Sequence, residues 1–162
     1  MVDPRQQLIR ILQNAHAGEL AAAYAYRGHW KSLRESSEKT EIKKIEEEEW
    51  QHRRNIDRWL AFFEAKPRPI REATFWTIGR MLGIGCYVSG WFMPMYFAGR
   101  LESQNVREYS EAAKYARELN MPDCEAEMLE MSDVEQQHET FFKTVVQGHS
   151  FLPLMRRVFR WG

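Results

Sequence analysis

The sequence predicts an all-α protein, a ferritin-like four-helix bundle in which a long crossover joins two helix pairs. Strand signals are nearly absent, because the chain has neither sustained apolar–polar alternation nor an Asn-Gly or Asp-Gly hairpin turn. Apolar residues instead recur at heptad spacing along four long segments. The connection within each pair is short, whereas the link between the pairs runs from Lys66 to about Gly90.

In the first pair, a helix is expected over about 4–33, because Asp3 is a good N-cap and proline is favoured at the first helical position. Ser36-Ser37 marks the turn, and a second helix is expected to reach about Ala65. The run Lys66-Pro67-Arg68-Pro69 ends that helix, since proline has no amide hydrogen to continue it.

The crossover and second pair follow. Residues 70–90 are apolar and rich in glycine, so a short helix and a bend are expected there. A third long helix is expected over about 91–119, with Pro94 in its first turn. Asn120-Met121-Pro122-Asp123 forms a tight turn, and a fourth helix should cover about 123–147.

Composition limits the class of protein. The 162 residues (19.3 kDa) suffice for one core, and 44% hydrophobic residues exclude a disordered chain. Lys plus Arg equals Asp plus Glu at 23 each, which argues against a nucleic-acid partner. Cys86 and Cys124 cannot form a disulfide scaffold or a zinc-finger ligand set, so a reducing compartment is expected. Residues 1–7 show no secretory signal.

The apolar stripe of each long helix is interrupted near its middle by a glutamate, and on two helices a histidine follows three residues later. Four buried carboxylates would repel one another unless divalent cations neutralised them. One Glu from each of two helices and Glu-x-x-His from the other two form the ligand set of di-iron and di-manganese carboxylate bundles. We therefore expect two Fe ions, with Mn or Zn as substitutes, on Glu19, Glu49, His52, Glu102, Glu135 and His138.

The spacing supports this ligand set. The two glutamates of the first pair are 30 residues apart and those of the second are 33 apart, so each pair returns to nearly the same height in its hairpin. The neighbouring Glu46-Glu47-Glu48 is interpreted as a solvated face, whereas Glu49 falls on the apolar stripe.

Other polar residues share these faces. Tyr26 and Tyr109 are expected to hydrogen-bond near the ligands, with ordinary core tyrosines as the alternative. His16 is expected to orient the first glutamate and Asp133 to hold a ligand histidine, or else each is simply a satisfied polar residue. His29, near a helix end, carries no functional signal.

Several motifs along most of the chain resemble a known family. They are His16-Ala17-Gly18-Glu19 with Ala22, Tyr26 and Gly28; Glu49-Trp50-Gln51-His52; Leu82-Gly83-Ile84-Gly85 to Gly90; Glu102 with Tyr109; and Asp133 with Glu135-Gln136-Gln137-His138. This pattern is similar to that of the demethoxyubiquinone hydroxylase family, the ferritin-like di-iron monooxygenases of ubiquinone biosynthesis. The resemblance implies O₂-dependent hydroxylation of a lipid-soluble quinone ring, with electrons from NADH or a reductase. Glu108 departs from the family, which usually has a histidine directly before the tyrosine, beside the metal site.

Two other functions are open from the residues. A ferritin- or rubrerythrin-like protein would oxidise or bind iron or scavenge peroxide, but storage needs a cage, and peroxidase activity usually goes with a Cys₄ iron site that two cysteines cannot supply. A non-enzymatic helical interaction module would leave the matched glutamates and the two Glu-x-x-His pairs without a reason.

Residues 81–99 carry no charge and are long enough to span a membrane, but four glycines and one proline break the run. With the basic, aromatic tail 150–162 that follows the bundle domain 1–149, the run is interpreted as a patch that lies on an anionic membrane. This interpretation predicts a cytoplasmic protein at the inner face of the membrane, and it makes the patch the quinone's entrance. The alternatives are a homodimer interface or a core segment of the bundle.

Overall fold

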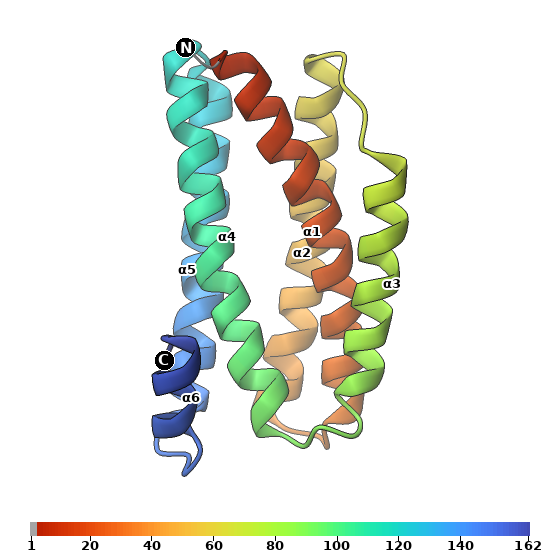
Figure 1. The fold of residues 1–162 in the computed structure, drawn as a ribbon, viewed down its shortest axis with the longest axis vertical. Helices are drawn as coiled ribbons and strands as arrows, with labels where there is room; N and C mark the ends of the chain where they lie inside the picture. Colours follow the sequence, from red (N-terminus) through yellow and green to blue (C-terminus); the bar gives the residue numbers. More distant parts are fainter. Residues whose placement is uncertain (1–2) are drawn as a thin grey trace.

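The computed structural model of the protein describes residues 3–162, which form six helices and no strand (Figure 1). Helix accounts for 82% of the described residues. The helices are α1 (Pro4–Ser32), α2 (Ser37–Phe62), α3 (Pro69–Gly85), α4 (Phe92–Glu118), α5 (Pro122–Val145) and α6 (Leu152–Phe159).

Two antiparallel hairpins, α1–α2 and α4–α5, form the four-helix bundle (Figure 1). The crossover between them contains α3, which packs along the outer side of α1 and returns the chain to the other end of the bundle. As a result α2 and α4 run in the same direction, and the all-α, ferritin-like fold with a long crossover is confirmed.

Local signals explain the helix starts. The Asp3 side chain accepts a hydrogen bond from the Arg5 amide at 3.0 Å, and the Ser36 hydroxyl accepts one from the Lys39 amide at 3.2 Å. Each cap satisfies an amide that has no partner within the helix. The long helices consequently begin within two residues of the predicted positions.

The crossover contains the expected helix and bend, but α3 is 17 residues long, longer than its glycines suggest, and the bend follows it at 86–91. Its glycines do not break it, since they allow the backbone to approach α1. A Cβ atom at Gly79 would lie 2.5 Å from the Ala21 carbonyl oxygen, and one at Gly28 would lie 2.2 Å from the Gly83 Cα atom. The close packing of α3 on α1 therefore requires glycine at these positions.

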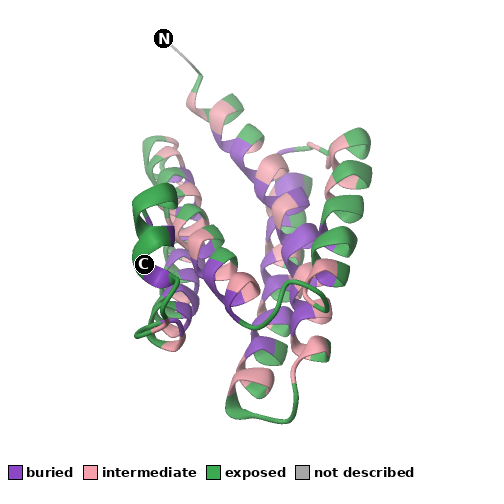
Figure 2. Cartoon of the chain, turned by 60° about the horizontal axis from the view of Figure 1, so that its bottom comes forward, coloured by how far each residue is buried: buried purple, intermediate pink, exposed green. Residues whose placement is uncertain are grey.

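Buried residues line the facing sides of the two hairpins (Figure 2). They form two apolar clusters, one containing Leu8, Ile56 and Met128 and the other containing Ile42 and Phe142. The predicted glutamates belong to neither cluster, although they are buried. A polar layer thus interrupts the apolar core.

The uncharged run 81–99 is divided between two environments. Met81, Ile84 and Val88 are exposed, whereas Met95 and Tyr96 are fully buried in α4, so part of the second half belongs to the core. Within residues 3–162, none of the helices is both long and apolar enough to cross a membrane.

The tail 150–162 packs partly into the bundle. Trp161 is buried, its indole nitrogen donates to Glu139 at 2.9 Å, and its carbonyl oxygen accepts from Tyr96 at 2.8 Å. Phe151, Leu154 and Val158 remain exposed. The division into a bundle domain and a separate tail stays a prediction.

Candidate metal centre

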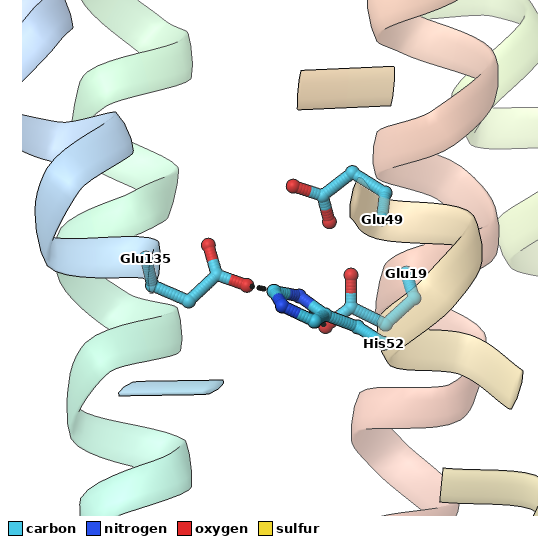
Figure 3. A group of neighbouring side chains, drawn as sticks. All are labelled: Glu19, Glu49, His52 and Glu135. Carbon is cyan, nitrogen blue, oxygen red and sulfur yellow. Dashed lines mark ion pairs between the residues drawn. The ribbon is translucent and has the colours of Figure 1, made fainter. Parts of the chain in front are cut away.

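The six predicted metal ligands converge in one layer between the two hairpins. Figure 3 shows Glu135 of α5 pointing across the bundle toward His52 of α2, with Glu19 and Glu49 beside it. All six side chains are buried, and three of the glutamates have no exposed surface at all; the six are Glu19, Glu49, His52, Glu102, Glu135 and His138.

Their donor atoms form two overlapping groups. Each group has one ligand atom per residue, and all its atoms lie within 4.8 Å of one another. Glu49 and Glu135 belong to both groups. Glu19 and His52 complete the first group, and Glu102 and His138 complete the second. The site thus offers two sets of four donors that share two carboxylates.

Many of these donor atoms lack a hydrogen-bond partner among the residues that the structure describes. Both carboxylate oxygens of Glu49 and of Glu135 are buried and unpartnered, as are Glu19 Oε2 and the Nδ1 atoms of His52 and His138. His52 Nδ1 lies 2.9 Å from Glu135 Oε1, but the two atoms do not have hydrogen-bond geometry. Unpartnered buried polar atoms are costly, and their convergence fits a cation bound at their centre.

The carboxyl groups interact strongly. Burial raises the pKa of Glu49 and Glu102 well above the usual carboxyl value, and the charge of Glu135 adds to both shifts. Burial acts the same way on Glu135, but its interactions with His138 and His52 outweigh burial and hold the pKa of Glu135 below its usual value. Without cations the layer therefore retains protons that cation binding would displace.

Both predicted tyrosines contact ligand carboxylates. The Tyr26 hydroxyl donates a hydrogen bond to Glu102 Oε1, and the Tyr109 hydroxyl donates one to Glu19 Oε1. Burial, followed by the charge of the adjacent glutamate, raises the pKa of each tyrosine well above 10. Both hydroxyls therefore remain protonated donors.

Glu48 is a contact of the site that the sequence analysis missed. Its Oε2 lies 3.0 Å from His138 Nε2. Because a carboxylate can only accept, the Nε2 atom carries the proton, and Nδ1 faces Glu49 and Glu135 at 3.6 and 3.4 Å. Glu48 thus holds the ring in the orientation that directs Nδ1 into the site.

The interpretation of Glu46-Glu47-Glu48 as one solvated face was therefore wrong, since only Glu47 is exposed. Glu46 is buried and accepts from Arg27 Nε at 2.7 Å and from Trp30 Nε1 at 2.6 Å. A local charge run gave no signal of these partners, because they lie on α1 and α5.

The structure does not bring the two other predicted orienting residues to the ligands. His16 is buried, but its Nδ1 atom bonds Glu72 of α3 at 2.8 Å rather than Glu19. Arg53 bonds the same Glu72 carboxylate at 2.8 Å, so this cluster joins three helices. Asp133 is exposed on α5, and within residues 3–162 it makes neither a hydrogen bond nor an ion pair with His52 or His138. The role expected of Asp133 is taken by Glu48.

Glu108, directly before Tyr109, is half-buried beside the site. Burial, followed by the charge of Glu19, raises the pKa of Glu108 to about 7, although Arg71 opposes the shift. Glu108 also lines a polar hollow with Arg10 and Arg107. The residue that replaces the family's usual histidine is therefore partly protonated near pH 7.

An apolar cavity of about 310 Å³ adjoins the site, between α1, α3 and α4. Tyr26 forms part of its wall, so the cavity reaches a residue that contacts a ligand carboxylate. Its lining is largely apolar and includes the exposed side chains Met81, Leu82, Phe97 and Leu101. The cavity therefore connects the exposed face of α3 and α4 with the vicinity of Glu102.

His29, which carried no functional signal in the sequence, also lines this cavity. It is only 2% exposed, and its Nε2 atom has no hydrogen-bond partner within residues 3–162. Its ring stacks on Phe142 of α5, a contact that its position near the end of α1 does not indicate.

One protein-family model matches residues 6–119 of the chain, and it is described as "Ubiquinone biosynthesis protein COQ7". The match covers more than two thirds of the chain and includes four of the six candidate ligands, whereas Glu135 and His138 lie beyond it. Searches of curated proteins and of solved structures found no match.

Proposed function

The chain belongs to the COQ7 family of ubiquinone biosynthesis proteins, and on this premise we propose that it is a di-iron monooxygenase that hydroxylates a demethoxyubiquinone-like ring with O₂. Family membership implies a hydroxylation step of ubiquinone biosynthesis. The observation that carries the two-metal proposal is the pair of overlapping donor groups that share Glu49 and Glu135.

The donors fit two divalent cations. Four carboxylates match the charge of two such ions, and oxygen and imidazole ligands suit iron or manganese. The unpartnered atoms of Glu49, Glu135, His52 and His138 are the ones a cation would engage. When bound, iron supplies the redox chemistry that activates O₂.

The chain's own residues hold the ligands. Tyr26 and Tyr109 keep their protons and donate to Glu102 Oε1 and Glu19 Oε1. Glu19 Oε2 stays unpartnered and open to a cation, whereas Glu102 Oε2 also accepts a hydrogen bond from Asn105 Nδ2 at 3.1 Å. Glu48 keeps the His138 proton on Nε2. Burial of the layer excludes bulk water from the carboxylates.

The substrate proposal rests on the apolar cavity, whose lining suits a lipid-soluble ring. Its exposed rim continues into apolar side chains of α3, and arginines such as Arg80 and Arg100 flank that face. We propose that this face lies on an anionic membrane surface, at the cytoplasmic side, where the quinone enters. NADH or a reductase would supply the two electrons.

The metal proposal is tested by the ion content of the purified protein, which should be about two per chain. Glu49→Ala and Glu135→Ala should each abolish binding of at least one ion, because both donor groups use both residues. Full retention of metal in both variants would refute the ligand assignment.

The reaction is tested by complementation of a bacterium that lacks its quinone hydroxylase. Growth on a respiratory substrate is expected with the wild-type chain and not with Glu49→Ala. Failure of folded, iron-loaded protein would favour the ferritin- or rubrerythrin-like alternative. Flotation with anionic and neutral vesicles tests the membrane face separately; absence from both would contradict it.

A further inference from the structure

We propose that His29 is a positioning residue for the substrate, whose Nε2 atom hydrogen-bonds an oxygen on the quinone ring in the apolar cavity. The inference rests on the proposed function for the identity of the ring. According to this proposal, the Nε2 atom of His29 makes the cavity bind an oxygenated ring more tightly than a plain hydrocarbon ring.

The first step is the mismatch between His29 and its surroundings. The side chain is buried in a cavity wall otherwise formed largely by apolar groups such as Met93 and Phe97. The other buried polar group of the wall, the Tyr26 hydroxyl, is already engaged with Glu102. His29 Nε2 is the buried atom of this wall that lacks a partner among residues 3–162. An unmet hydrogen bond at such a place is costly unless a ligand completes it.

The second step is the rigidity of the ring. The His29 imidazole stacks on Phe142 with ring centroids 6.4 Å apart and planes 14° apart. Phe142 in turn stacks on Tyr26 at 5.9 Å and 8°. Packing on Phe142, which is itself stacked on Tyr26, restricts rotation of the imidazole, and a nitrogen held in this way favours orientation of a ligand.

The third step is the charge state. Burial lowers the pKa of His29 to about 4, so the ring is neutral at pH 7. A neutral imidazole presents one donor and one acceptor nitrogen, which suits a quinone carbonyl or a phenolic hydroxyl. A permanently charged ring would instead favour an anionic ligand, which the apolar wall would not stabilise.

The fourth step is the location relative to the metal layer. His29 and Tyr26 are three residues apart on α1, so they lie on one helix face about one turn apart. A ring oxygen bound at His29 therefore places the ring beside Tyr26, which contacts the candidate ligand Glu102. The apolar tail is left to extend toward the exposed mouth at Met81 and Leu82.

The test uses metal-free protein and two probes, a 1,4-benzoquinone with a short alkyl tail and an alkylbenzene with the same tail. Dissociation constants are measured by calorimetry for the wild type, His29→Phe and His29→Gln. Phenylalanine retains the stacking on Phe142 but not the hydrogen bond, whereas glutamine retains a donor and an acceptor. His149→Phe is the matched control, because it makes the same exchange at a histidine that stacks on Phe92 and does not line this cavity.

We expect His29→Phe to weaken quinone binding about tenfold, the equivalent of one lost hydrogen bond, and to leave alkylbenzene binding within about twofold. His29→Gln should restore most of the quinone affinity, and His149→Phe should leave the affinity for both probes unchanged. Circular dichroism verifies that each variant is folded.

The proposal is overturned if His29→Phe weakens both probes equally or neither, or if the wild type binds no quinone. Its failure is separable from that of the proposed function. Loss of the selective binding with hydroxylation intact removes only the role of His29. Selective binding by a chain that, loaded with iron, hydroxylates no quinone removes only the proposed reaction.

Discussion

The exchange Glu49→Gln should change the stability of the protein in opposite directions without and with metal. Glu49 is fully buried, both of its carboxylate oxygens are unpartnered, and it belongs to both donor groups. Burial and the charges of Glu135 and Glu19 raise its pKa, so in the metal-free protein an ionised Glu49 is destabilising. Glutamine has the same shape and no charge, and its amide can donate to a neighbouring carboxylate.

The expected change in stability equals the energetic cost of the buried, ionised Glu49 carboxylate that the exchange removes. A buried, unsatisfied polar group costs about 1–3 kcal/mol. For a chain of this length, about 1 kcal/mol shifts Tm by about 2–4 °C. The metal-free Glu49→Gln protein should therefore unfold about 2–12 °C above the wild type. With saturating metal the order reverses, because each of the two ions adds about 2.7 kcal/mol to the wild type at 100 times its Kd, about 5.4 kcal/mol in all, whereas the variant lacks a ligand of both ions.

The assay is thermal unfolding followed by circular dichroism, in chelator and in excess Fe²⁺ without oxygen. Glu47→Gln is the matched control, since it makes the same chemical change on the exposed side of α2 and should behave as the wild type in both conditions. The reasoning is refuted if Glu49→Gln lowers the Tm in chelator and keeps the full metal-induced increase.

Three further predictions concern other parts of the structure. In the metal-free protein, the interactions with Glu135 and Glu48 outweigh the burial of His138 and raise its pKa to about 9 from the usual 6.5. The stability that protonated His138 contributes is therefore complete below pH 6.5 and falls by up to about 3 kcal/mol as pH rises through 9. Denaturant titrations at pH 6 and 9 measure this change, and an equal or higher stability at pH 9 would contradict it. Glu48→Gln should weaken metal binding about 10- to 100-fold, because Glu48 orients His138. Competition with a chelator measures the affinity, and the control Glu47→Gln should leave it unchanged. Equal metal affinities of Glu48→Gln and the wild type would remove the orienting role of Glu48. Gly28→Ala should lower the free energy of unfolding by about 1–3 kcal/mol, because the added Cβ atom would overlap the Gly83 backbone. Gly18→Ala, with open space at that position, should raise the free energy of unfolding by up to about 1 kcal/mol. A Gly28→Ala variant as stable as the wild type would show that α3 does not pack on α1 as described.

Features read from periodicity agree with the structure because each depends on a single helix. A heptad stripe and a cap residue such as Asp3 or Ser36 act within one helix, so the four long helices could be predicted. Glu49 and His52 lie on one face wherever the helix packs. The layer of candidate ligands could therefore be predicted from one further assumption, that the apolar stripes of the four helices face the inside of the bundle.

The crossover helix was underestimated for a tertiary reason. Glycines in an isolated segment lower helix propensity, which favoured a short helix over 70–90. In the folded chain, Gly79 and Gly83 meet the backbone of α1, and that packing supports 17 helical residues. A propensity cannot include a partner that lies some 55 residues away.

By itself the sequence determined the helices, the hairpins with their long crossover, and the six donor residues at matching heights, because these follow from spacing along one helix. Tertiary structure alone decided which neighbours serve the donors. It placed Glu48 on His138, turned His16 toward Glu72, and left His29 buried without a partner beside an apolar cavity. The physical reason is that hydrogen bonding and desolvation depend on what the other helices bring within about 3 Å, and no period in the sequence records that distance.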